Sequence, residues 1–232
     1  MAFAFPPPEQ VYLDINGTDA RFAVRRIYCV GKNYTAHVIE MGGDVDRDPP
    51  VIFQKPADAV VRNGGEIGYP VFTKLYHYEG EMVVALKSGG HHIKVEDAAS
   101  HIFGYAVGLD MTRRDHQAHA LTHGLPWEVT KSFDQSAPMG PITKIEDCGE
   151  LTEGRIKLSV NGELRQDADM SWMIWKTAEI ISKLSEQYRL MPGDLIMTGT
   201  PAGVGEVRSG DQILVEVEGL TALQVTIGAP VA

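Results

Sequence analysis

The chain has 232 residues, with 31 acidic and 21 basic side chains, a formal net charge of −10 and a hydrophobic fraction of 44%. These values are typical of a globular protein with one large domain or two small ones. The negative charge argues against a nucleic-acid partner, no apolar run approaches the roughly 20 residues of a membrane span, and two isolated cysteines provide no disulfide framework. We therefore expect a reduced, cytoplasmic protein.

The N-terminal segment predicts a β-hairpin. Val11–Ile15 and Ala20–Val24 have strand patterns and flank Asn16-Gly17, a dipeptide that is typical of tight hairpin turns. We expect residues 1–25 to form a small β-hairpin annex on a catalytic domain that spans residues 26–232.

The rest of the chain predicts many short strands and few helices. Helical spacing marks Asn33–Met41, and an acidic loop that ends in proline follows at Asp44–Pro50. β-Branched and aromatic runs predict strands at Arg26–Val30, Val51–Phe53, Glu81–Leu86, Gly104–Leu109, Ile156–Val160 and Gln212–Val217. Helices are expected at Val95–Ser100 and Trp172–Glu186, and Asn161-Gly162 predicts a second hairpin turn. Because the helices do not alternate with the strands, we expect a mixed, β-rich α/β fold rather than a doubly wound sheet.

Three acidic residues lie next to apolar strands. Glu79 and Glu81 are two residues apart, so an extended chain directs both carboxylates to one side, and Asp110 ends the run Gly104–Leu109. Burying such charges without a cation is costly, and oxygen ligands with open coordination positions suit Mg²⁺ or Mn²⁺. The pattern indicates a metal site, although a solvated strand end explains Glu79 and Glu81 equally well on their own.

A histidine-rich segment offers a rival metal hypothesis. His119 and His123 are four residues apart and share one face of a helix, with Asp115 and His116 close by. The glutamate of the H-E-x-x-H signature is missing, because Ala120 follows His119. A polar surface helix is the preferred interpretation of this segment.

Three other segments carry groups that suit acid–base or oxyanion chemistry. His37 and Glu40 are three residues apart, so on a helix the carboxylate orients the imidazole and raises its basicity, unless the two form a plain surface pair. Lys131 either offsets surplus carboxylates and stabilises an oxyanion or lies on the surface. The glycines of Gly193–Gly205 allow backbone N–H groups and the Thr200 hydroxyl to approach a small carboxylate.

Five segments, in this order, resemble the fumarylacetoacetate hydrolase family. They are Tyr28–Tyr34, His77–Glu81, Phe103–Asp115, Lys131–Asp134 and Gly193–Gly205. The resemblance covers about residues 26–225. It implies a single mixed β-sandwich roll, usually a homodimer, that holds one Mg²⁺ or Mn²⁺.

The resemblance also implies roles for individual residues. The implied metal ligands are Glu79, Glu81 and Asp110. The implied catalytic groups are Lys131 and the dyad of His37 and Glu40, which resembles the dyad on the lid helix of short, acylpyruvase-like members. The implied substrate contacts are Lys32, Tyr34, Arg113, Gln117 and Thr200. Lys32 is a departure, since many relatives have Arg there and lysine lacks its bidentate fork.

The function implied by the resemblance is hydrolysis of a carbon–carbon bond in an acylpyruvate. Fumarylpyruvate or maleylpyruvate, a small dicarboxylic oxo-acid, would give pyruvate plus fumarate or maleate, as in gentisate-type aromatic catabolism. We expect residues 33–50 to form a lid over the substrate. The alternatives are oxaloacetate decarboxylation or isomerisation of a dienoic diacid by the same family, and an inert metal–carboxylate-binding protein.

Overall fold

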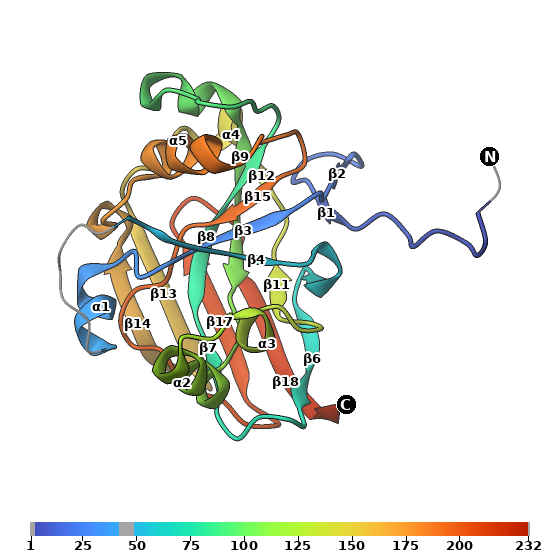
Figure 1. Ribbon diagram of the computed structural model, residues 1–232, viewed down its shortest axis with the longest axis vertical. Coiled ribbons are helices and arrows are strands. Elements are labelled where there is room, and N and C mark those ends of the chain that lie inside the picture. The colour runs from blue at the N-terminus through green and yellow to red at the C-terminus, as the bar shows by residue number, and fades with distance from the viewer. Residues whose placement is uncertain (1–2, 42–48, 232) are drawn as a thin grey trace.

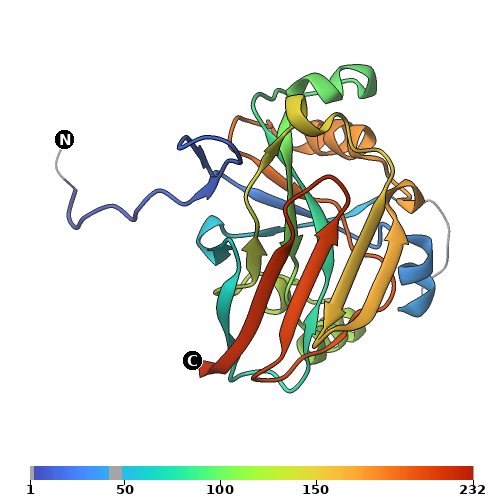
Figure 2. The ribbon, with the colours of Figure 1, turned by 180° about the vertical axis from the view of Figure 1, so that it is seen from behind.

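Two main β-sheets face each other in the computed structural model, which describes residues 3–41 and 49–231 (Figure 1). The larger sheet has the order β4 (Val51–Lys55), β3 (Ile27–Gly31), β15 (Leu195–Met197), β8 (Gly80–Leu86), β9 (Ile102–Leu109), β11 (Ala137–Met139) and β5 (Val60–Arg62), with β12 (Thr143–Lys144) also paired to β9. The smaller sheet has the order β14 (Glu163–Asp169), β13 (Arg155–Val160), β17 (Gln212–Val217), β18 (Leu223–Val231) and β6 (Gly65–Pro70), and Figure 2 shows it from its outer side.

Short sheets and helices surround this sandwich. One ribbon pairs β1 (Tyr12–Asp14) with β2 (Arg21–Ala23), and another has the order β10 (Thr112–Arg113), β7 (Tyr76–Tyr78) and β16 (Gly205–Glu206). The α-helices are α1 (Thr35–Glu40), α2 (Arg114–His123), α3 (Glu128–Lys131), α4 (Ile145–Cys148) and α5 (Thr177–Gln187). The 3₁₀-helices are η1 (Ala57–Ala59), η2 (Val95–His101) and η3 (Met170–Trp172). None of these described helices is long and apolar enough to cross a membrane.

The main core lies between the two sheets because their strands alternate apolar residues toward each other. Met82, Val84 and Leu86 of β8 lie on this face, and they share one buried cluster with Leu158 of β13 and Val215 of β17. Full burial of such an aliphatic side chain contributes about 1.5–3 kcal/mol. The sandwich therefore forms a rigid support for whatever lies at the ends of β8 and β9.

The other face of the larger sheet packs against the N-terminal hairpin. Val83 and Ala85 of β8 belong to a second buried cluster that includes Leu13 and Phe22 of the hairpin. The predicted hairpin is confirmed, since β1 and β2 pair antiparallel. The exposed residues 3–10 extend away from the body of the molecule (Figure 1).

Most predicted elements are confirmed, but the predicted start of one helix is wrong. The predicted strands all occur, and β13 and β14 form the hairpin expected at Asn161-Gly162. The helix expected at Trp172–Glu186 begins only at Thr177. Its first residues are held instead by Asn33, whose side chain binds both the backbone N–H and the carbonyl of Trp175, at 2.7 and 3.0 Å. The segment predicted as a helix at Val95–Ser100 is a 3₁₀-helix.

The helix predicted at Asn33–Met41 is present as α1 (Thr35–Glu40). The greater part of the predicted acidic loop Asp44–Pro50, and with it much of the lid expected at 33–50, lies outside the described residues.

Candidate active site

The three predicted carboxylates come together where β8 and β9 end. Gly80 pairs with Leu109 in the larger sheet, so the residues just outside this pair, Glu79 and Asp110, are neighbours. The backbone N–H of Asp110 donates to the carbonyl of Glu79 at 2.9 Å. Glu81 lies one residue into β8, and the three carboxylates each offer an oxygen within 4.8 Å of the others. All three side chains are buried.

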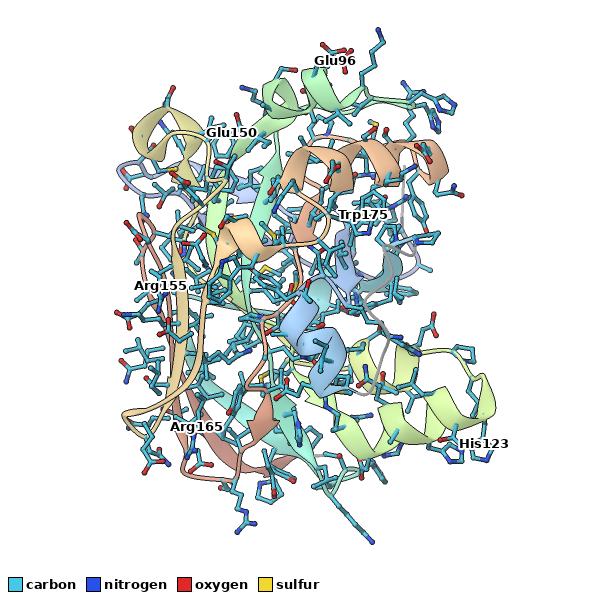
Figure 3. The ribbon with its side chains drawn as sticks, turned by 90° about the vertical axis from the view of Figure 1, so that its left-hand side faces the viewer. Glu96, His123, Glu150, Arg155, Arg165 and Trp175 are labelled. Atoms are coloured by element: carbon cyan, nitrogen blue, oxygen red, sulfur yellow. The ribbon has the colours of Figure 1, made fainter. Side chains whose placement is uncertain are left out.

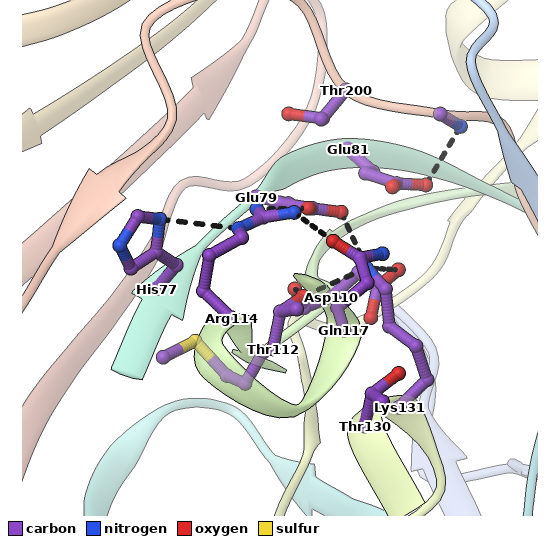
Figure 4. Close-up of polar contacts among 12 residues, drawn as sticks. His77, Glu79, Glu81, Asp110, Thr112, Arg114, Gln117, Thr130, Lys131 and Thr200 are labelled. Atoms are coloured by element: carbon purple, nitrogen blue, oxygen red, sulfur yellow. Dashed lines mark hydrogen bonds and ion pairs between the residues drawn. The ribbon is translucent and has the colours of Figure 1, made fainter. Parts of the chain in front are cut away.

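Buried cations surround these carboxylates (Figure 4). Lys131 Nζ lies 2.7 Å from Glu79 Oε2, 2.8 Å from Asp110 Oδ2 and 2.7 Å from the Thr112 hydroxyl. Arg114 forms an ion pair with Glu79, and Lys55 Nζ lies 2.9 Å from Asp110 Oδ1. Lys131 is therefore a buried partner of the carboxylates rather than a surface lysine, as one of its two interpretations predicts.

Two of these cations were not singled out from the sequence. Lys55 is the last residue of strand β4 and is buried. The feature of the sequence that could indicate it is a lysine at the end of a strand pattern. Arg114 lies within the segment Phe103–Asp115 that carries the family resemblance, but the neighbouring Arg113 was the residue assigned to substrate. Because each reaches its partner across the tertiary fold, local spacing does not identify either.

The cations do not satisfy the three carboxylates equally. Burial alone would raise the pKa of Glu79, but the charges of Lys131 and Arg114 lower it below its ordinary value. For Lys131 the carboxylates outweigh the effect of burial and raise the pKa. Burial, and then the charges of Asp110 and Glu79, raises the pKa of Glu81 well above its usual range. Glu81 accepts a backbone N–H from Gly199 at 2.7 Å, and no cation among the described residues is within ion-pair distance of it.

The donor set fits a hard divalent cation. Three carboxylates with no sulfur or imidazole in the group suit Mg²⁺ or Mn²⁺, which prefer oxygen ligands and leave positions for substrate oxygens. A cation among these carboxylates would also relieve the repulsion that raises the pKa of Glu81. Within residues 3–41 and 49–231 no other group of three or more such ligands is found.

The rival histidine site is not assembled. Asp115 accepts from the backbone N–H groups of Lys74 and His116, at 2.8 and 3.0 Å, and His116 contacts the carbonyl of Phe72. Figure 3 shows His123 at the outer end of α2. His119 and His123 are exposed on this helix, as the surface-helix interpretation predicts, while the helix buries Arg114, Gln117 and Ala120.

His37 and Glu40 form the predicted pair on α1. His37 Nδ1 lies 3.2 Å from Glu40 Oε2, and the Glu40 carboxylate also accepts the backbone N–H of Gly203 at 3.1 Å. His37 is buried and lines the cavity, whereas Glu40 is exposed and does not line it. Because Nδ1 faces Glu40, Nε2 is the ring nitrogen of His37 that remains available to a ligand in the cavity.

A cavity of about 80 Å³ joins the carboxylates to His37. One water needs about 10–15 Å³ of such space, so the cavity has room for several water-sized groups. Its polar lining residues are Lys32, His37, Glu79, Glu81, Asp110, Arg114, Gln117, Lys131 and Thr200. Its larger apolar lining residues are Val30, Met41, Phe53, Leu121 and Trp127. The cavity therefore has the mixed character expected for a small, partly apolar oxo-acid.

Three of the five predicted substrate contacts, Lys32, Gln117 and Thr200, line this cavity, and two do not. The Arg113 guanidinium lies over the ring of Phe133, 4.3 Å from its centre, and Arg114 takes the place beside the carboxylates. The side chain of Tyr34 is buried beside a separate groove behind α1.

The glycine-rich loop holds carboxylates of the protein itself. Gly199 donates to Glu81 and Gly203 donates to Glu40, so these N–H groups position site residues rather than point freely into the cavity. The Thr200 hydroxyl donates to the carbonyl of Gly80 at 2.9 Å and accepts from Gln166 Nε2 at 2.8 Å. Gln166 is a buried supporting residue that no sequence motif marked.

Comparisons with known proteins show which family and which proteins this chain is similar to. A family model described as fumarylacetoacetate (FAA) hydrolase C-terminal matches residues 26–228. The chain is 40% identical over 190 residues to fumarylpyruvate hydrolase of Ralstonia sp, covering 81% of this chain and 98% of that protein. It is 39% identical over 200 residues to the mitochondrial oxaloacetate tautomerase of Mus musculus, covering 86% and 90%.

A solved structure is similar over nearly the whole chain. The crystal structure of fumarylpyruvate hydrolase from Pseudomonas aeruginosa in complex with Mn²⁺ and pyruvate matches with a TM-score of 0.96 and 48% identity. The match covers 98% of this chain and 100% of that one.

Proposed function

The chain belongs to the fumarylacetoacetate hydrolase family, and from this premise we propose that it is a metal-dependent hydrolase of fumarylpyruvate or maleylpyruvate. The products would be pyruvate plus fumarate or maleate. The observation that carries the proposal is the meeting, in one cavity, of a carboxylate triad, the buried Lys131 and the paired imidazole of His37.

Glu79, Glu81 and Asp110 would hold one Mg²⁺ or Mn²⁺. Support comes from the relative of Pseudomonas aeruginosa, whose crystal structure contains Mn²⁺ and pyruvate. When bound, the cation acts as a Lewis acid that polarises the oxo group and stabilises negative charge.

The charges of the site fit a dianionic substrate. Three carboxylates and the three cations Lys55, Arg114 and Lys131 balance one another, so a divalent cation leaves an excess of two positive charges at the triad, and Lys32, which lines the same cavity, adds a third. An acylpyruvate with two carboxylates offsets most of this excess. Arg114 and Gln117 line the cavity beside the triad, so they are positioned to bind the carboxylate at the pyruvate end, and Lys32 is proposed to bind the distal one.

His37 is the proposed general base. With Nδ1 held by Glu40, Nε2 accepts a proton from a water molecule, whose oxygen forms a bond to the carbonyl carbon of the acyl group. The carbon–carbon bond then breaks, its electron pair remains on the pyruvate fragment as an enolate, and protonation of that fragment gives pyruvate. Lys131 stabilises the developing negative charge from its buried position. General-base catalysis of this kind contributes roughly 10²–10⁴-fold to the rate.

A second activity is favoured by one observation. The oxaloacetate tautomerase of Mus musculus is nearly as similar to this chain as the fumarylpyruvate hydrolase of Ralstonia sp. Tautomerisation, like oxaloacetate decarboxylation or dienoic-diacid isomerisation, requires no attacking water.

A homodimer, a cytoplasmic location and a role in gentisate-type aromatic catabolism belong to the same proposal as the hydrolase.

The experiment is release of pyruvate from fumarylpyruvate and maleylpyruvate by chelator-stripped protein, with and without Mg²⁺ or Mn²⁺. Turnover that depends on the cation and yields equal amounts of pyruvate and fumarate or maleate is expected. His37→Ala should lower kcat by about 10²–10⁴-fold, while His91→Ala, a change at an exposed histidine that does not line the cavity, should not. If His37→Ala retains kcat within about a factor of two, His37 is not the base. If oxaloacetate turns over instead, the second activity is favoured, and release of pyruvate from it distinguishes decarboxylation from tautomerisation.

A further inference from the structure

A histidine that has no assigned role touches the arginine of the cavity. Arg114 Nε donates to His77 Nδ1 at 3.2 Å (Figure 4). The contact follows from the sheet, because Thr112 of β10 pairs directly with His77 of β7 and Arg114 begins α2 two residues later. His77 does not line the cavity itself, so it reaches the site only through Arg114.

The guanidinium of Arg114 is held on three sides. Its Nε donates to His77, one terminal nitrogen donates to Gln117, and the other donates to Glu79. A planar group with one acceptor on each nitrogen has a fixed orientation. Arg114 has five N–H donors and three of them are used here, so the group still has donors for a ligand in the cavity that it lines.

The three acceptors differ in charge. Arg114 has no acceptor and always donates, so His77 must accept at Nδ1 and carry its proton at Nε2, which makes it a neutral imidazole. Gln117 is neutral as well. Two neutral acceptors fix the direction of the guanidinium without cancelling its positive charge, whereas the charged acceptor, Glu79, is a member of the metal-binding triad.

We propose that His77 is a positioning residue that orients Arg114, so that the arginine presents its charge to the carboxylate at the pyruvate end of the substrate. This inference rests on the proposed function for the identity of that ligand. A carboxylate in place of His77 would orient the arginine equally well but would pair with its charge. A neutral acceptor is therefore the chemical feature that matters at this position.

The test compares three substitutions at one position. His77→Asn keeps a neutral acceptor close to the place of Nδ1, His77→Leu removes it, and His77→Asp adds a negative charge. The dissociation constant of pyruvate is measured on the Mn²⁺-loaded proteins, together with kcat and KM for fumarylpyruvate. A lost hydrogen bond to a charged group predicts that His77→Leu weakens pyruvate binding about ten- to hundredfold and raises KM more than it lowers kcat. His77→Asn should stay close to the unmodified protein, and His77→Asp should weaken binding like His77→Leu.

Two controls separate positioning from folding and from metal loss. Thermal melting should show that each variant is folded at the assay temperature, and the Mn²⁺ dissociation constant of each should match that of the unmodified protein. The proposal is overturned if His77→Leu binds pyruvate normally, if His77→Asn is as weak as His77→Leu, or if the loss follows a loss of Mn²⁺. Pyruvate binding does not require turnover, so the inference can succeed even if hydrolysis is not observed.

Discussion

Replacement of Lys55 by methionine tests the charge balance of the site most directly. The substitution removes an ammonium group that is fully buried and keeps an unbranched side chain of similar length. Lys55 Nζ lies 2.9 Å from Asp110 Oδ1 and also donates to the backbone carbonyls of Met111 and Lys131. Its loss leaves a buried carboxylate oxygen without its ion-pair partner and two backbone carbonyls without this donor.

The expected cost follows from that burial. Breaking a buried ion pair by removing one partner costs about 3–5 kcal/mol. In a chain of this length each kcal/mol shifts Tm by about 2–4 °C, so we expect Lys55→Met to lower Tm by about 10 °C in chelated protein. The variant site has one more uncompensated negative charge, so Mn²⁺ should raise its Tm by more than it raises that of the unmodified protein.

The assay is thermal melting with and without Mn²⁺, alongside a matched control. Lys157→Met makes the same chemical change at an exposed lysine of β13 and should leave Tm nearly unchanged. Two results would contradict the reasoning. One is a Lys55→Met protein that melts within about 2 °C of the control, and the other is a Mn²⁺-induced rise in Tm that is no larger than in the unmodified protein.

Three further predictions concern the metal, its pH dependence and the glycine-rich loop. Chelation should lower Tm, and readdition of Mn²⁺ should restore it with one ion bound per chain, a stoichiometry that calorimetric titration measures. Glu81→Gln should abolish this change of Tm with Mn²⁺. Because the pKa of Glu81 is raised by burial and by neighbouring carboxylates, a proton competes with the cation, so Mn²⁺ affinity should fall as the pH is lowered. In chelated protein the same raised pKa means that stability is lost as the pH rises through it, and this slope of Tm should be smaller in Glu81→Gln. Gly203→Ala should lower both Tm and kcat, because the new Cβ would lie 2.0 Å from the carbonyl oxygen of Arg165 and would displace the N–H that holds Glu40. Gly210→Ala has the same φ of +96° but lies in open space, so it should cost only about 1–3 kcal/mol of stability and leave kcat unchanged.

The sequence predicts those parts of the site that depend on local geometry. Glu79 and Glu81 are brought together by the alternation of an extended chain, and His37 and Glu40 by one turn of helix, so spacing alone identified both pairs as candidates. The strand pattern of β9 likewise placed Asp110 at a strand end.

The missed features depend on contacts between distant segments. Lys55 reaches Asp110 from another strand, and the two are 55 residues apart in the sequence. The choice between Arg113 and Arg114 is made by tertiary packing, since Arg113 stacks on Phe133 while Arg114 turns toward Glu79. The late start of α5 has the same origin, because the backbone groups that would extend it are bound by Asn33, more than 140 residues earlier.

The net negative charge of the molecule affects the rates at which anions enter and leave the cavity. A dianionic acylpyruvate approaches a protein of net charge −10, so the long-range field opposes its arrival, and the local positive excess acts only within about 8 Å at physiological ionic strength. Association should therefore become faster as salt is added, the reverse of the usual steering of an anion into a basic cleft. Hydrolysis of a fumarylpyruvate dianion yields a dianion, a monoanion and a proton, so the products carry one more negative charge than the substrate. The same field that slows entry then favours exit, and measurement of kcat/KM and of product inhibition against ionic strength would show both effects.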